Sequence, residues 1–170
     1  MKKLFLFYLL IFTSNFLLAQ FSNNKIVEFY SVEKNISIDA GKEFQINLQA
    51  KIQNGWHINS NKPLDEFLIA TKIFIKDKNF EIKKIEYPKA KEIKLEFSEN
   101  PVSVFDGTEN FKVTLVSKNN LSNDEYKLPI YFYYQGCNNE SCMPPNEIST
   151  EVVLKVNKST QAEITSTIQN

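Results

Sequence analysis

The two cysteines of this chain are the residues best suited to carry chemistry. Cys137 and Cys142 lie in segment 134–145, which reads YQGCNNESCMPP. The first cysteine ends an aromatic, strand-like run, and the second precedes two prolines, which cannot continue a strand ladder. If residues 136–143 form the tip of a hairpin, the cysteines face each other across its base, where directly opposed Cα atoms are about 4.5 Å apart. A disulfide accepts that separation, so the spacing predicts a Cys137–Cys142 bridge.

Such a bridge would be either a structural clip or a site of thiol–disulfide exchange. In the chain-entropy model a loop this short contributes only about 2 kcal/mol, against about 5 kcal/mol for a hundred-residue loop. The pair joins nothing distant in the sequence, and at a loop tip the sulfur of another protein can reach it in line. These features favour exchange, with a local clip in a small exported domain as the alternative. No Cys-x-x-Cys motif and no helix start lie beside the pair to lower a thiolate pKa, so an exchanging pair would need a partner protein.

The sequence contains few residues that could form a hydrolase or metal site. His57 is the only histidine, which leaves no basis for a Cys-His-Asp hydrolase or a multi-histidine metal site. A soft Cu(I) site built from Cys137, Cys142, Met143 and His57 is an alternative, but we expect neither a metal nor another cofactor. The formal net charge of zero excludes nucleic acid or an anionic membrane surface as a partner held by charge alone.

The elements that position the cysteines are expected to be strands. Residues Glu43 to Gln53 alternate between apolar and polar side chains, which predicts a strand with one buried face. Turn dipeptides such as Asn54-Gly55 and Asp106-Gly107 separate further strand-like runs. These runs are Val27–Val32, Thr71–Ile75, Phe80–Ile82, Ile93–Phe97, Val102–Phe105, Phe111–Val116, Leu128–Tyr134 and Thr150–Val156. The pattern predicts an all-β fold, an immunoglobulin-like antiparallel β-sandwich with a cysteine hairpin, although periodicity alone does not separate a sandwich from a barrel.

The chain is predicted to contain one domain between two terminal segments. Residues 1–19 combine two early lysines, an apolar run and a small-residue end at Ala19, which is typical of a cleavable signal peptide. The apolar run is about half the roughly 20 residues needed to cross a bilayer. Residues 20–157 would form the domain, and the polar residues 158–170 a tail. We therefore expect an exported protein in a compartment where disulfides form.

The cysteine segment also resembles a known family. It is similar to the N-terminal periplasmic domain of DsbD in the aromatic run Tyr131–Tyr134, in the Gln-Gly-Cys that follows it, and in Cys142-Met143-Pro144-Pro145. Segments 55–59 and 104–107 also fall where that domain has recognisable sequence. The resemblance covers about residues 26–156. It implies an immunoglobulin-like fold whose cysteines cycle between dithiol and disulfide. It also implies a periplasmic protein-disulfide reductase, an oxidoreductase acting on sulfur groups, which takes electrons from a membrane-embedded thiol carrier and passes them to thioredoxin-like proteins.

The resemblance also implies roles for single residues. Cys142 would be the attacking thiol and Cys137 the resolving one. Phe105 matches the aromatic of a cap loop that hides the disulfide, with core packing as the alternative. Trp56 and Tyr134 are candidates for framing the pair, and for Trp56 core packing is again the alternative.

Three features depart from the family pattern. Four residues separate the cysteines, where the best-known members have five. Ser103-Val104 replaces the acidic pair before the cap aromatic, which puts proton handling by those carboxylates in doubt. Neither a membrane segment nor a thioredoxin-like domain follows in this sequence, so the expected electron donor is a separate protein.

Overall fold

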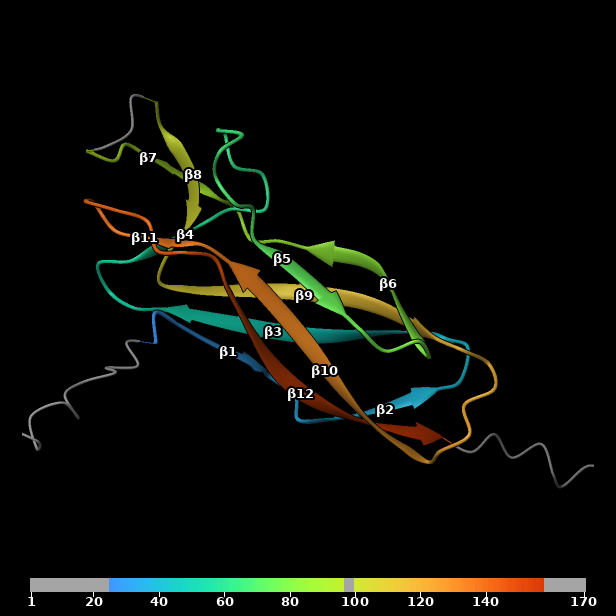
Figure 1. Ribbon diagram of the computed structural model, residues 1–170. Coiled ribbons are helices and arrows are strands. Elements are labelled where there is room, and N and C mark those ends of the chain that lie inside the picture. The colour runs from blue at the N-terminus through green and yellow to red at the C-terminus, as the bar shows by residue number, and fades with distance from the viewer. Residues whose placement is uncertain (1–24, 97–99, 158–170) are drawn as a thin grey trace, which may run out of the picture.

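A computed structural model describes residues 25–96 and 100–157, and these residues form strands, turns and loops (Figure 1). The strands build three four-stranded sheets, two of which pack face to face as the predicted sandwich. No helix in the described part of the chain is long and apolar enough to cross a membrane. The predicted signal peptide, residues 1–19, and the predicted tail, residues 158–170, lie outside the described residues.

The first sheet has the order β1-β3-β9-β6, with every neighbouring pair antiparallel. Its strands are β1 (Val27–Ser31), β3 (Glu43–Ile52), β9 (Thr108–Ser117) and β6 (Phe80–Glu86). The alternation predicted for β3 is confirmed, because Ile46, Leu48, Ala50 and Ile52 are buried. Strand β6 runs four residues beyond its prediction, past a bulge between Ile82 and Lys84.

The second sheet has the order β2-β12-β10-β5. Its strands are β2 (Asn35–Asp39), β12 (Asn146–Asn157), β10 (Glu125–Tyr134) and β5 (Lys72–Ile75). Strand β2 was not predicted, and it pairs with β12 in parallel, whereas the other strand pairs in the described residues are antiparallel. Its five residues carry only one buried side chain, Ile38, which is too weak a pattern to identify from periodicity.

Aromatic rings join the two large sheets. Phe29 of the first sheet stacks on Phe132 of the second, with ring centroids 4.6 Å apart, and Phe111 meets the same ring edge-on at 5.5 Å. All three side chains belong to the main hydrophobic core. Burial of such large apolar surfaces is the dominant favourable contribution to folding, so the sandwich supplies a stable body on which a small third sheet rests.

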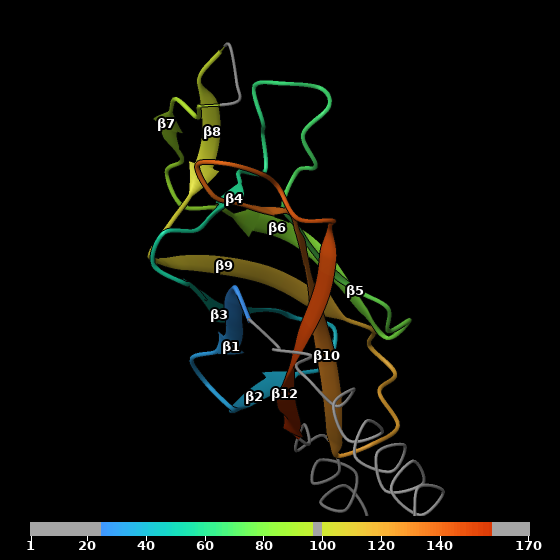
Figure 2. The ribbon, with the colours of Figure 1, turned by 60° about the vertical axis from the view of Figure 1, so that its left-hand side comes forward.

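The third sheet lies at one end of the sandwich and carries the first cysteine (Figure 2). Its order is β11-β4-β8-β7, from strands β11 (Gly136–Cys137), β4 (His57–Asn59), β8 (Val102–Phe105) and β7 (Lys91–Ile93). Strands β4 and β11 are too short to be predicted from alternation. The predicted strand Ile93–Phe97 is wrong over residues 94–96, because β7 ends at Ile93 and Leu95 is buried in a small second core with Val102 and Val104. Phe97 lies outside the described residues.

Candidate functional site: a disulfide at the edge of the third sheet

The predicted disulfide is present in the structure. Cys137 and Cys142 are bonded, with their Cα atoms 4.0 Å apart, and they form an antiparallel bridge across the hairpin. Their neighbours on either side carry the backbone hydrogen bonds: Met143 N donates to Gly136 O at 2.8 Å, and Asn138 N donates to Ser141 O at 2.9 Å. The cysteines are therefore a directly opposed, non-hydrogen-bonded pair, the position in which side chains lie closest.

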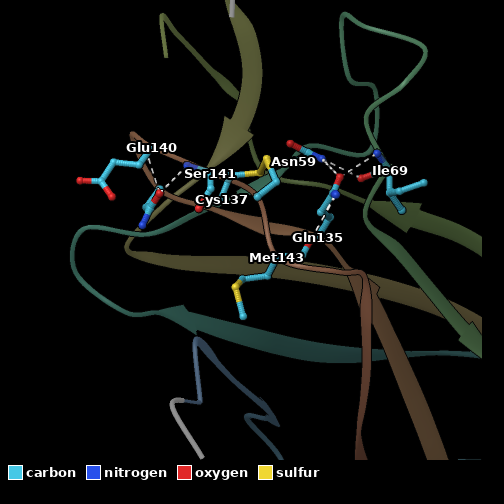
Figure 3. The surroundings of a disulfide bond; sticks show 9 residues. Asn59, Ile69, Gln135, Cys137, Glu140, Ser141 and Met143 are labelled. Carbon is cyan, nitrogen blue, oxygen red and sulfur yellow. Dashed lines mark hydrogen bonds between the residues drawn. A yellow bond between two sulfur atoms is a disulfide. The ribbon is translucent and has the colours of Figure 1, made fainter. Parts of the chain in front are cut away.

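The side chain of Asn138 shapes the tip of the hairpin. Its Oδ1 accepts hydrogen bonds from Glu140 N at 2.9 Å and from Ser141 N at 2.8 Å (Figure 3). Asparagine favours such turns because its short side chain can satisfy nearby backbone donors. The chain therefore reverses within four residues and brings Cys142 back beside Cys137.

The two cysteines differ in exposure. Cys137 is fully buried, whereas Cys142 is partly exposed. Cys137 belongs to β11, which is paired on its other side with β4, while Cys142 lies on the outer, returning segment. An approaching partner sulfur therefore has access to Cys142 rather than to Cys137, since in-line attack requires an open approach.

Gln135 anchors the base of the hairpin to two other segments. Its Oε1 accepts hydrogen bonds from Asn59 Nδ2 at 3.0 Å and from Ile69 N at 3.2 Å, and its Nε2 donates to Met143 O at 3.3 Å (Figure 3). Asn59, which is 1% exposed, also donates to Ile69 O at 3.1 Å. One side chain thus ties β4, the loop before β5 and the segment after Cys142 together. Neither Gln135 nor Asn59 is predicted as a site residue from the sequence.

Side chains in the third sheet separate into two faces. Gly136 is opposite Ile58, and Ile58 is opposite Phe105, so these three residues share one face. Cys137 is opposite His57, and both lie on the other face, because neighbouring residues of a strand point in opposite directions.

By this register Phe105 lies on the face of the third sheet away from Cys137. The resemblance implied a ring on a cap loop, but Phe105 is the last residue of β8 and is fully buried. Its ring meets Phe111 edge-on at 5.9 Å and stacks with Tyr87 at 6.5 Å, and it belongs to the main core. Its position is that of a core residue, and a capping role for its ring stays a prediction.

Trp56 and Tyr134 lie beside the hairpin. A Cβ atom on Gly136 would come within 3.8 Å of the Trp56 ring and 3.3 Å of Ile26, so the glycine lets these side chains pack against the strand of the first cysteine. Tyr134 is 3% exposed, its hydroxyl accepts a 3.4 Å hydrogen bond from Asn146, and burial raises its pKa. Tyr134 also lines a pocket of about 260 Å³ together with Met143.

The residues considered for the alternative Cu(I) site do not lie on one face of the hairpin. Met143 is opposite Gly136 and so lies on the face opposite Cys137 and His57, and the two sulfurs are bonded to each other rather than free as thiolates. Within residues 25–96 and 100–157, no cluster of three or more histidine, cysteine, aspartate or glutamate side chains is arranged to hold a metal ion.

A second pocket borders the site on the side of His57. It has a volume of about 590 Å³, and its lining includes His57, Trp56, Asp106 and Asn139 from the cysteine hairpin. His57 is 5% exposed. Burial lowers the pKa of His57, while the negative charge of Asp106 opposes that shift.

Comparison with solved structures gives only distant likenesses. The major pilin subunit BcpA of Bacillus cereus is 9% identical with a TM-score of 0.43, and the match covers 77% of this chain and 40% of that one. A non-cellulosomal cohesin from Archaeoglobus fulgidus is 8% identical with a TM-score of 0.36, covering 80% and 94%. The periplasmic chaperone SfaE is 9% identical with a TM-score of 0.36, covering 78% and 58%. At these scores the likenesses carry no argument. No curated protein sequence matches the chain significantly.

A family model does match. The model described as "Thiol:disulfide interchange protein DsbD, N-terminal" covers residues 25–154, a span that includes the three sheets described above almost completely. Together with the bonded pair at the hairpin, this match supports a thiol–disulfide exchange domain. The chain belongs to the family of DsbD N-terminal domains, a periplasmic family.

Proposed function

We propose that this protein is an exported carrier of reducing equivalents that works through a reversible Cys137–Cys142 disulfide. Its electron donor would be a membrane-embedded thiol carrier of the DsbD type on a separate chain, and its acceptors would be periplasmic thioredoxin-like proteins. The observation that carries the proposal is the placement of the bridge. It clips two directly opposed residues of one hairpin and leaves one of the two cysteines partly exposed, which supports a small contribution to stability and access for exchange.

The two cysteines have different roles in this proposal. A thiolate of the donor attacks Sγ of Cys142, the disulfide breaks, and Cys137 leaves with the electron pair. The second donor thiolate then attacks the mixed disulfide and releases Cys142, so that the domain gains two electrons and two protons while the donor becomes a disulfide. The difference in burial supports this order, because Cys137 has no exposed surface. On the acceptor side the sequence runs in reverse, with Cys142 attacking and Cys137 resolving.

A redox titration tests the proposal. Structural disulfides of secreted proteins have potentials below roughly −300 mV, while exchanging ones have higher potentials. We expect a potential above that value against a glutathione or thioredoxin-like buffer. A bridge that stays oxidised under these reductants would instead support a non-catalytic binding or scaffold domain with a structural clip.

Matched single variants test the assignment of the cysteines. Cys137→Ser retains Cys142 and should accumulate a long-lived mixed disulfide with a thioredoxin-like partner, because the resolving sulfur is missing. Cys142→Ser retains only the buried sulfur and should accumulate much less. Mass spectrometry of non-reduced mixtures measures both adducts, and the opposite ranking would overturn the assignment.

A further inference from the structure

His57 is the ionisable side chain placed directly across the sheet from Cys137. The register pairs the two residues, and Asn59 N donates to Gln135 O at 3.2 Å two residues further along the same ladder. Antiparallel pairs alternate, so His57 and Cys137 also form a hydrogen-bonded pair, and directly opposed side chains have Cβ atoms about 4.5–5.5 Å apart. Cys142 lies on the far side of Cys137. One row across the sheet therefore runs from His57 to Cys137 to Cys142.

One ring nitrogen of His57 has no hydrogen-bond partner among the described residues. This atom, Nε2, is buried. A buried polar group without a partner costs about 1–3 kcal/mol, and native proteins contain few of them. The neighbouring cysteine offers a reason why His57 Nε2 has no partner, because the sulfur of Cys137 is in a disulfide and has no proton to donate. Reduction of the bridge would supply an S–H donor on the residue directly opposite His57 in the ladder.

Burial favours a neutral imidazole near pH 7. Burial lowers the pKa of His57 and is the larger influence, while Asp106, in the turn after β8, raises it. Lys91 of β7 pairs with Asp106 and offsets its charge. Lys51 of β3 lines the same pocket. Glu109 of β9 lies near Asp106 and Lys91, and burial raises the pKa of its carboxyl. A neutral imidazole with a free lone pair is a competent proton acceptor.

We propose that His57 is the general base for Cys137, taking the proton from its thiol when Cys137 resolves a mixed disulfide on Cys142. This inference rests on the proposed function. In the step, the Cys137 S–H proton passes to His57 Nε2, and the Cys137 sulfur attacks the Cys142 sulfur. The Cys137–Cys142 bond forms, the bond between Cys142 and the partner breaks, and the partner leaves as a thiolate. No outside oxidant is needed. In the reverse direction the imidazolium returns the proton to the departing Cys137 sulfur.

The size of the expected effect follows from the thiol pKa. An unperturbed cysteine has a pKa near 8.5, and burial in apolar surroundings raises it. At pH 7 only a few per cent of such a thiol is ionised, so a positioned base can accelerate resolution by at least about tenfold. Above the thiol pKa the sulfur is already a thiolate, and the base gives no advantage.

The experiment measures resolution directly. Reduced protein is mixed with oxidised glutathione as the probe, and the release of glutathione from the Cys142 adduct is followed by rapid quench and mass spectrometry. We expect His57→Gln to resolve at least about tenfold more slowly than wild type at pH 7. Its rate should then rise with pH until the two proteins converge near pH 10. The matched control is Ile58→Val, a conservative change on the opposite face of the same strand, which should leave the rate and its pH profile unchanged.

A second variant separates the chemical role from a structural one. His57→Ala leaves space next to the 590 Å³ pocket, and added imidazole should restore part of its resolution rate in a concentration-dependent manner. A structural role would give no such rescue. If wild type resolves the adduct, equal rates for wild type and His57→Gln at pH 7 would overturn the proposed role of His57 and leave the proposed function standing. If wild type forms no adduct or never resolves it, the proposed function fails together with this inference.

Discussion

At the scale of single residues, position in the third sheet decides what each side chain can do. Successive residues of a strand face opposite sides, so Ile58 points to the main core while His57 points to the face of the cysteines. The same rule, applied through the register, places Phe105 and Cys137 on opposite faces of the third sheet. A shift of one residue in register would exchange these two faces.

Phe105→Ala is expected to behave as a core substitution. The ring is fully buried and contacts Phe111 and Tyr87, and Phe→Ala changes in a core cost about 3–5 kcal/mol. Denaturant unfolding should show that loss, while the rate of reaction with a small disulfide, measured by stopped flow on folded protein, should change little. A markedly faster reaction with only a small loss of stability would restore a capping role.

His57 should make the stability of the domain depend on pH. Because burial lowers its pKa below the usual 6.5 in the folded state, the unfolded chain binds its proton first as the pH falls. The free energy of unfolding should therefore decrease as the pH drops below about 6.5, and level off once the folded state is also protonated. His57→Gln should flatten this part of the curve in denaturant melts at several pH values. An unchanged slope in the variant would mean that other groups cause it.

At the scale of elements, the cysteine hairpin is held by its base rather than by its own length. Strand β11 has two residues, and an isolated two-stranded hairpin is marginally stable in water. Its support comes from β4 and from Gln135, which contacts both Asn59 and the backbone of Ile69. The disulfide closes the outer end, so the hairpin remains anchored at its base when the bridge opens.

Gln135→Ala and Asn59→Ala should each destabilise the domain by about 1–3 kcal/mol, because each leaves buried or half-buried polar groups without partners. The double variant should lose less than the sum of the two, since the side chains share a hydrogen bond. Denaturant unfolding of all four proteins measures the coupling. The control is Asn110→Ala, which removes an exposed hydrogen bond to Gln49 and should change stability by no more than about 0.5 kcal/mol. Strict additivity would show that the network is not a unit.

At the scale of the whole molecule, the main core lies mostly between the two large sheets, and Ile58 and Phe105 of the third sheet join it. The large sheets enclose the main core, which holds most of the buried apolar side chains, while the disulfide lies at one end in the small third sheet (Figure 2). The proposed carrier function requires the fold to survive repeated opening of the disulfide, and the position of most of the core between the large sheets predicts that reduction leaves the sandwich folded.

The double variant Cys137→Ser/Cys142→Ser should therefore stay folded. The lost loop constraint is worth about 2 kcal/mol, against the roughly 5–15 kcal/mol that stabilises a typical domain. Thermal unfolding should show one cooperative transition at a moderately lower temperature, close to that of wild type held in reductant. Failure of the variant to fold at 25 °C would assign the disulfide a structural role.

The sequence by itself determined the fold class, the long strands and the disulfide. Residues 43–53 alternate with period two over a long stretch, and the cysteines are close enough in sequence for a hairpin to force their pairing; both signals are local. The family was also readable from the residues around the cysteines, and the family model confirms it.

Only the tertiary structure decided the neighbours of the cysteine pair. Strands of two and three residues carry too little periodicity to be predicted, yet β4 and β11 place His57 opposite Cys137 from 80 residues away. The position of Phe105 depends on the register between β4 and β8, and the parallel pairing of β2 with β12 joins the two ends of the described chain. These contacts are non-local, and they form because the packing of the sandwich brings distant segments together rather than because of any pattern within a segment.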